Sequence, residues 1–258
     1  MIGTWWRRKR DRHALRERAI PDDLWLETLG DFPFLKYRPL PDLLKLRELA
    51  TLFLARKEFA TAGGLELTDR IALAVAAQAC VPVLHLGLDW YDGFIGIVLH
   101  PDEVVAQREW ADDDGIVHTG EEVLAGEAMP GGPVMLSWRD VQAAGETAST
   151  GYNVVIHEFV HVLDMRDGPA DGIPPLATAA QRQRWIDVMS RSHAEFCKQL
   201  QAGRDTLLDP YAANGLEEFF PVCAEAFFVA PSTLHGEHRE VYELLLDFFR
   251  QDPIRLTR

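Results

Sequence analysis

The chain has 258 residues and a net charge of −14, from 40 acidic and 26 basic side chains, and its pI is about 5.0. This balance argues against a protein that binds nucleic acid directly, because contacts to phosphate backbones depend on clustered lysine and arginine. Hydrophobic residues make up 47% and charged residues 26%, the composition of an ordinary globular protein rather than a disordered one.

The N-terminal segment has the opposite charge. The first 18 residues carry a local charge of +5, so the rest of the chain sums to −19. No apolar stretch follows, which excludes a secretory signal. Trp5 and Trp6 beside a run of arginines fit a membrane interface, but a solvated and disordered basic tail is the simpler interpretation. We therefore expect a basic tail over residues 1–20 and a single domain over residues 21–258.

The most apolar run, residues 71–88, is a poor candidate for a membrane span. It is interrupted by polar or helix-breaking residues: Gln78, Pro82 and His85. It predicts a buried helix, a turn and a strand instead, so we expect no transmembrane segment. The three cysteines are far apart and form no disulfide framework, which favours the reducing cytoplasm.

The first half of the chain predicts both helices and strands. Apolar spacing predicts a helix over residues 43–59, and Thr68 is a plausible N-cap for a second helix that continues through Ala79. Short strands are expected over residues 94–99 and 134–138, where apolar runs are bounded by Gly, Pro or Asp.

The second half predicts mainly helices, over residues 153–165, 177–200, 216–229 and 239–250. A few early strands that need later helices to cover them indicate an α+β fold with a small mixed sheet and a mostly helical C-terminal half.

The chemistry is concentrated in one predicted helix, where His157, Glu158 and His161 form a His-Glu-x-x-His motif. The two histidines stand one turn apart on the same face, so both imidazoles can reach one ion. Zinc suits two neutral imidazoles, a carboxylate and an open position. Glu158 is rotated about 100° from His157 and is therefore placed beside the ion, where it can act as general base. Buried ionisable groups in so apolar a helix need partners or a metal.

A third ligand is expected on a later helix, which offers Glu217, Glu218 and Glu225. Positions 218 and 225 share a helix face because they are seven residues apart. One of that pair is expected to bind zinc and the other to orient a ligand from behind. Glu217 falls off this face and is expected to be solvated.

Together with the zinc motif, several other stretches resemble the Mlc titration factor A family of bacterial zinc metallopeptidases, which is similar in catalytic fold to the lethal-factor toxin protease. The resemblance covers nearly the whole chain and is carried by residues 31–35, 78–84, 89–92, 136–138, 157–165, 211–213, 218, 225–228 and 251–253.

The resemblance implies a zincin-like fold and one Zn²⁺ per chain, bound by His157, His161 and Glu218. It implies Glu158 as the general base and Tyr211 as the group that stabilises the oxyanion, a reasonable use of a phenol donor. The family also has an upstream histidine that can approach the metal; His118 matches it and would close the site as a fourth ligand.

Three further assignments come from the residues themselves. Asp164 lies seven residues after His157 and is expected either to accept an imidazole N–H or to face solvent. Residues 134–138 are expected to form either the edge strand along which a peptide substrate lies or an ordinary core strand. Cys223 is expected simply to pack in the core.

The resulting hypothesis is a zinc peptidase of the gluzincin type that hydrolyses peptide bonds with metal-activated water. The resemblance further implies aminopeptidase action on short peptides and binding of the glucose repressor Mlc. The alternative is a non-catalytic or weakly catalytic regulator that sequesters a transcriptional repressor. A regulator with so acidic a chain is expected to bind a protein rather than DNA.

Overall fold

A small mixed sheet forms one side of the protein. The structure is a computed structural model that describes residues 2–111 and 117–256. Its main sheet has the strand order β1-β2-β6-β5. Strands β1, β2 and β6 are mutually parallel, whereas β5 runs antiparallel to β6 and forms an edge. The strand bounds are Glu58–Thr61 for β1, Gly96–His100 for β2, Gly126–Ala128 for β5 and Val134–Ser137 for β6.

The substrate-edge interpretation of residues 134–138 is wrong. β6 pairs with β2 on one side and with β5 on the other, so its backbone N–H and C=O groups are already used. Val134 and Leu136 are buried, as in a core strand. The edges of this sheet are β1 and β5, and β5 is a strand of only three residues.

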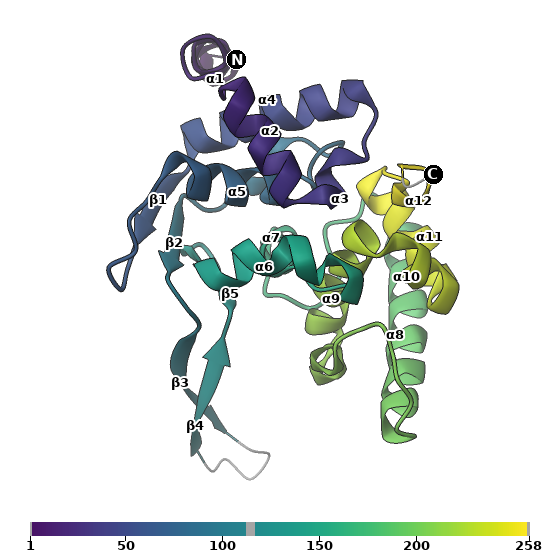
Figure 1. Ribbon diagram of the computed structural model, residues 1–258. Helices are drawn as coiled ribbons and strands as arrows, with labels where there is room; N and C mark the ends of the chain where they lie inside the picture. Colours follow the sequence, from purple (N-terminus) through teal and green to yellow (C-terminus); the bar gives the residue numbers. More distant parts are fainter. Residues whose placement is uncertain (1, 112–116, 257–258) are drawn as a thin grey trace.

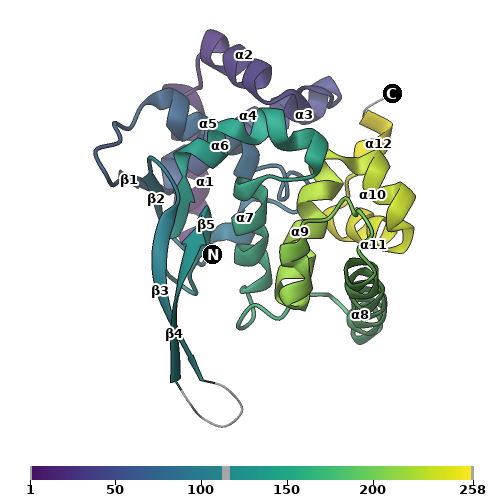
Figure 2. The ribbon, with the colours of Figure 1, turned by 60° about the horizontal axis from the view of Figure 1, so that its bottom comes forward.

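A long hairpin leaves the body of the protein ahead of β5. Strands β3 (Val104–Ala111) and β4 (Val117–Leu124) pair antiparallel as a separate two-stranded sheet. Figures 1 and 2 both show this hairpin projecting away from the helices. Because β4 leads directly to β5, the base of the hairpin lies beside the sheet edge.

Five helices precede or alternate with the first strands. Their bounds are Ile2–Glu17 for α1, Asp22–Asp31 for α2, Pro33–Lys36 for α3, Leu40–Arg56 for α4 and Asp69–Ala79 for α5. Thr68 is the N-cap of α5, as expected, and its side chain accepts the backbone N–H of Ile71. The predicted helix over residues 43–59 ends earlier, at Arg56, because Phe59 belongs to β1 and packs its ring against Phe53.

The strand expected near residue 88 does not form. After α5 the chain makes turns and a short 3-10 helix, η1 (Leu88–Tyr91). The Tyr91 hydroxyl donates to the Ala79 carbonyl at 2.7 Å and holds this segment against the end of α5. Pro82 has no N–H to offer to a strand ladder.

The C-terminal half is helical. One of its helices, α7 (Val154–Asp164), lies between the sheet and α9 (Figure 2). A cluster of aromatic rings that includes Trp185, Phe220 and Phe249 packs α8, α9 and α11 together. This arrangement confirms the predicted α+β class. The remaining bounds are Trp138–Thr147 (α6), Ala148–Thr150 (η2), Ala179–Gln201 (α8), Pro210–Asn214 (η3), Leu216–Val229 (α9), Pro231–Glu237 (α10), Arg239–Phe249 (α11) and Pro253–Leu256 (α12).

Within the described residues, every helix is too short or too polar to cross a bilayer.

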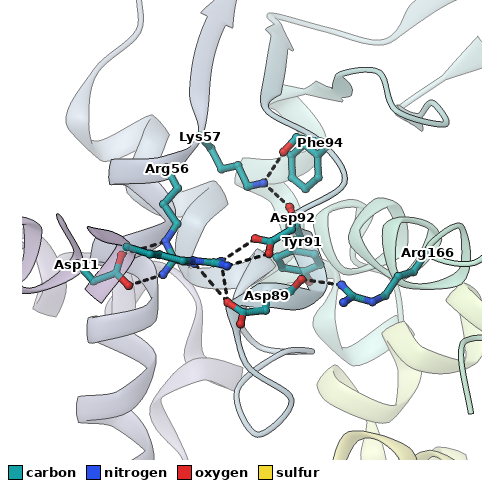
Figure 3. Close-up of polar contacts among 9 residues, drawn as sticks. Asp11, Arg56, Lys57, Asp89, Tyr91, Asp92, Phe94 and Arg166 are labelled. Carbon is teal, nitrogen blue, oxygen red and sulfur yellow. Dashed lines mark hydrogen bonds and ion pairs between the residues drawn. The ribbon is translucent and has the colours of Figure 1, made fainter. Parts of the chain in front are cut away.

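The basic N-terminal segment is a helix attached to the body rather than a disordered tail. Arg7 of α1 forms ion pairs with Asp89 and Asp92, each at 2.7 Å. One turn further on, Asp11 pairs with Arg56 at the end of α4, also at 2.7 Å. Figure 3 shows Asp11 and Arg56 beside Asp89 and Asp92 of the loop that contains η1.

The same loop also contacts Lys57, the residue between α4 and β1, and the segment that follows α7. Lys57 donates to the carbonyls of Tyr91 and Phe94, and burial lowers the pKa of its amine to about 8. From the other side, Arg166 donates to the Asp89 carbonyl at 2.6 Å (Figure 3). One loop therefore joins α1 to the segment that follows α7.

The two arginine contacts of α1 are expected to differ in strength. The Arg56 and Asp11 side chains are only 22% and 23% exposed, whereas Asp89 is 71% exposed. Arg7→Gln should therefore lower the free energy of unfolding by less than about 1 kcal/mol, and about 1 M NaCl should remove the difference. Arg56→Gln should cost more and keep most of its effect in salt. Urea unfolding at low and high salt checks this, and equal salt-insensitive losses would contradict it.

Candidate metal centre

The helix that carries the two histidines begins at a fully buried cap. The Asn153 side chain accepts the backbone N–H of Ile156 at 2.9 Å and so starts α7. Beyond the cap, apolar side chains such as Phe159 and Val160 fill the core. His157 and His161, one turn apart, lie on the face of α7 that meets α9.

Three donor atoms from two helices converge on one point. The Nε2 atoms of His157 and His161 lie 3.2 Å apart. The Oε2 atom of Glu218 on α9 is 3.2 Å from the first and 3.4 Å from the second. Among the described residues this trio is the His, Cys, Asp and Glu group that is spaced to hold a metal ion. The structure therefore brings together the two histidines and the first of the two carboxylates that the helix spacing pointed to.

The second of those carboxylates lies behind His157. Glu225 Oε1 is 2.7 Å from His157 Nδ1, and its Oε2 accepts the backbone N–H of Asn153 at 2.5 Å. Asn153 in turn donates from Nδ2 to Gln78 of α5 at 2.8 Å. Because Nδ1 donates its proton to Glu225, the Nε2 lone pair of His157 faces the point where the three metal-ligating atoms converge.

This donor set fits a divalent transition metal. Two imidazole nitrogens and a carboxylate oxygen are ligands that such ions prefer. Two lone pairs facing each other at 3.2 Å repel unless a cation or a proton lies between them. The carboxylates of Glu158, Glu218 and Glu225 also concentrate negative charge around neutral imidazoles, and an ion would offset it.

The pKa values of His157 and Glu218 show the same concentration of charge. Burial lowers the pKa of His157, but its hydrogen bonds to Glu218 and Glu225 outweigh burial and raise this pKa well above the ordinary value. Burial acts on Glu218 in the opposite sense, and its contacts with the two histidines lower its pKa to about 2. The cluster therefore attracts positive charge.

Glu158 lies beside this point, under the edge strand. Its side chain is 5% exposed, and burial raises its pKa above the ordinary value. A Cβ added at Gly126 of β5 would come within 2.6 Å of Glu158 Cγ. Only a residue without a side chain fits there, so Gly126 lets the carboxylate occupy its place between β5 and α7.

These groups line a cleft of about 580 Å³ between the edge strand and α9. Tyr211 of η3 is also in its wall, 40% exposed, with its ring centroid 6.2 Å from that of His157. Asp209 caps η3 by accepting the Tyr211 backbone N–H at 2.8 Å. Tyr211 is therefore at the metal centre rather than at a remote surface.

Three other expected residues have different placements. Asp164 Oδ2 accepts the backbone N–H of Gly172 at 2.8 Å rather than an imidazole N–H. Glu217 stays outside the converging trio. His118 pairs its backbone with Trp110 in the hairpin, but its side chain lies outside what the structure describes, so its approach to the metal stays a prediction.

Two parts of the site were missed from sequence. Gly126 lies in a three-residue strand without any alternating pattern, so no local signal marks it. Gln78 does have a signal, because it is a fully buried polar residue in the otherwise apolar stretch 71–79 of α5 and therefore needs a partner.

In this site a helix presents two histidines and a glutamate to a carboxylate on a second helix, and a short edge strand lies beside them. This is the arrangement of a metal-dependent hydrolase. The comparisons with known proteins agree. The model of the glucose-regulated metallo-peptidase M90 family matches residues 4–250, and the chain belongs to this family. It is similar to Mlc titration factor A of Yersinia pestis (strain Pestoides F), at 35% identity over 91% of this chain and 87% of the relative. The same values hold for Mlc titration factor A of Yersinia pseudotuberculosis serotype O:3 (strain YPIII).

The carboxylate behind His157 should control metal affinity. In Glu225→Gln the amide NH2 group faces either the Asn153 N–H or the His157 N–H, so one of the two hydrogen bonds is lost. We expect metal affinity to fall about 10-fold to 100-fold, measured by competition with a chromogenic chelator. The matched control is Glu217→Gln, on the same helix but outside the trio, which should leave affinity unchanged. Equal affinities in both variants would contradict this assignment.

Proposed function

We propose that the protein is a zinc-dependent peptidase of the gluzincin type, with one ion held by His157, His161 and Glu218. The observation that carries this proposal is the convergence of their three donor atoms beside the buried Glu158, in a cleft bordered by a strand edge. Zinc is favoured over harder ions because two of the three donors are imidazole nitrogens. When bound, zinc would act as a Lewis acid and lower the pKa of water to about 7.

The side chains then have separate tasks. Glu158 takes a proton from the attacking water and delivers it to the amine that leaves. Its position under Gly126 keeps the carboxylate away from bulk solvent. The Tyr211 phenol donates a hydrogen bond to the oxygen on which negative charge develops. Glu225 does not touch the substrate, and holds His157 in the required tautomer.

The substrate is proposed to be a peptide that extends the sheet. β5 borders the cleft and has one free side in the strand order, so an extended main chain can add to it by backbone hydrogen bonds. Glu127 and Asp209 also line this cleft. A wall with these carboxylates suits the α-ammonium group of a free N-terminus, which supports aminopeptidase action on short peptides.

The central test is Glu158→Gln, which removes the general base while keeping the volume of the side chain. The variant should bind zinc as the wild type does, and hydrolysis of chromogenic amino-acid amides should fall about 100-fold or more. If wild type and variant cleave these substrates equally, the mechanism is wrong.

A second variant checks the position of the base without changing it. Gly126→Ala pushes a methyl group into the Glu158 carboxylate and should lower kcat while zinc stays bound. Gly30→Ala is its control, because an added Cβ there meets nothing within 4 Å.

We also propose that the protein binds a transcriptional repressor of the Mlc type. The support is its similarity, over 91% of the chain, to relatives named for titration of Mlc. A cytoplasmic location would fit both roles, since Cys80, Cys197 and Cys223 are all free thiols.

The repressor proposal is tested by pull-down with a purified Mlc-type repressor. Wild type and Glu158→Gln should retain it equally, because binding does not need the general base. The absence of a complex at micromolar concentration would count against this role. A complex without any peptidase activity would instead favour a purely regulatory protein.

A further inference from the structure

A second cavity, of about 320 Å³, lies away from the metal cleft. It is enclosed by α3, the end of α6, the end of α9 and the beginnings of α10 and α12, which meet on one side of the protein (Figure 2). Phe228 in its wall follows Glu218 by ten residues on α9, a separation of roughly 15 Å along the helix. The cavity is therefore distinct from the metal centre.

Close helix packing closes one wall. Gly145 of α6 lines this cavity, and a Cβ added there would lie 2.0 Å from the Asp31 carbonyl oxygen. The absence of a side chain lets α6 approach the α2–α3 junction. This part of the cavity wall is thus held in place by backbone contact between helices.

The unusual feature of this cavity is a buried arginine. Arg38 lines it and is only 6% exposed. Its Nη1 donates to the Phe34 carbonyl at 2.7 Å. Its Nε is buried without a hydrogen-bond partner. Among the described residues Arg38 has neither a carboxylate within ion-pair distance nor a second acceptor, although a guanidinium carries five N–H donors.

Local structure compensates this charge only in part. A guanidinium stays protonated in proteins, so burial without a counter-ion is costly. Burial lowers the pKa of Arg38 to about 10, and Asp42 offsets only some of that effect. Helix α3 ends next to Arg38, but it has only four residues and therefore a weak dipole.

We propose that this cavity binds a small organic carboxylate, with Arg38 as the group that holds the anion. Nε–H and Nη2–H lie on one edge of a guanidinium and match the two oxygens of a carboxylate. The Nε atom is closed to solvent, so binding requires a small shift of the Arg38 side chain toward the cavity.

The walls specify the rest of the ligand. Phe34, Phe228 and Pro231 give an apolar surface that suits a hydrocarbon or aromatic body. The exposed Glu146 also lines the cavity and disfavours a ligand with several negative charges. A monocarboxylate with a short apolar body fits both features better than phosphate does.

The test uses phenylacetate as the probe and the zinc-loaded full-length protein. Calorimetric titration should give saturable binding to wild type, whereas the neutral phenylacetamide should bind at least about 10-fold more weakly. Inorganic phosphate should bind more weakly than phenylacetate. Arg38→Gln should weaken phenylacetate binding about 10-fold or more. Phenylacetate that binds at the metal centre also binds to this variant. The difference in binding between wild type and Arg38→Gln therefore measures the Arg38 cavity alone.

Two further variants keep the proposal falsifiable if Arg38→Gln folds poorly. Ser149→Trp leaves Arg38 in place but fills the cavity, and it should abolish the component that depends on Arg38. Glu146→Gln removes the competing negative charge and should preserve or strengthen binding. Equal phenylacetate binding in wild type, Arg38→Gln and Ser149→Trp would overturn the proposal. Equal binding of phenylacetate and phenylacetamide, or no binding at millimolar probe, would also overturn it.

Discussion

The hydrogen bond between Glu225 and His157 is the interaction on which the site depends. It joins α9 to α7 across the core, and Glu225 is only 2% exposed. A buried carboxylate is tolerated only when its oxygens are paired, and here the second oxygen takes the first free N–H of α7, at Asn153. One residue thus binds the N-cap residue of α7, orients an imidazole and links the two helices that carry the metal-ligating atoms. Gln78 of α5 accepts a hydrogen bond from the Asn153 side chain and so extends this series of hydrogen bonds to a third helix. A large part of the core therefore supports the geometry of His157.

Charge organises the rest of the protein. The acidic body concentrates carboxylates at the metal centre, where two imidazoles and a bound ion would offset them. The basic helix α1 is held by acidic residues of the loop that Arg166 also contacts (Figure 3). Arg38 is the exception, since its cation is buried without a carboxylate partner within the described residues. The metal centre and the Arg38 cavity therefore pose the same physical problem with opposite signs of charge.

Patterns with a clear period were predicted correctly. The helices that carry the motif and Glu218 follow apolar spacing, and Thr68 has the cap geometry that its position indicated. The predictions of secondary structure were wrong where tertiary contacts decide between a helix and a strand, or between a strand and a turn. Phe59 continues an apolar helical face but pairs as a strand with β2, and the segment after Ala79 is held in turns by the Tyr91 hydroxyl. The basic N-terminal segment was expected to be a disordered tail. Its ion-pair partners lie 82 and 85 residues away, so its local sequence does not reveal them.

The sequence by itself determined the chemistry of the site: two histidines one helical turn apart, a glutamate next to the first and a choice of carboxylates on a later helix. It did so because helical periodicity links spacing to direction within one element. Only the tertiary structure decided which carboxylate meets the imidazoles and which lies behind them, since positions 218 and 225 share a face and differ only in what packs against them. It also decided that β5 is an edge strand beside the metal centre, that Gly126 leaves room for Glu158, and that Arg38 lines a cavity. These features depend on how separate elements pack, and spacing along one element does not encode that packing.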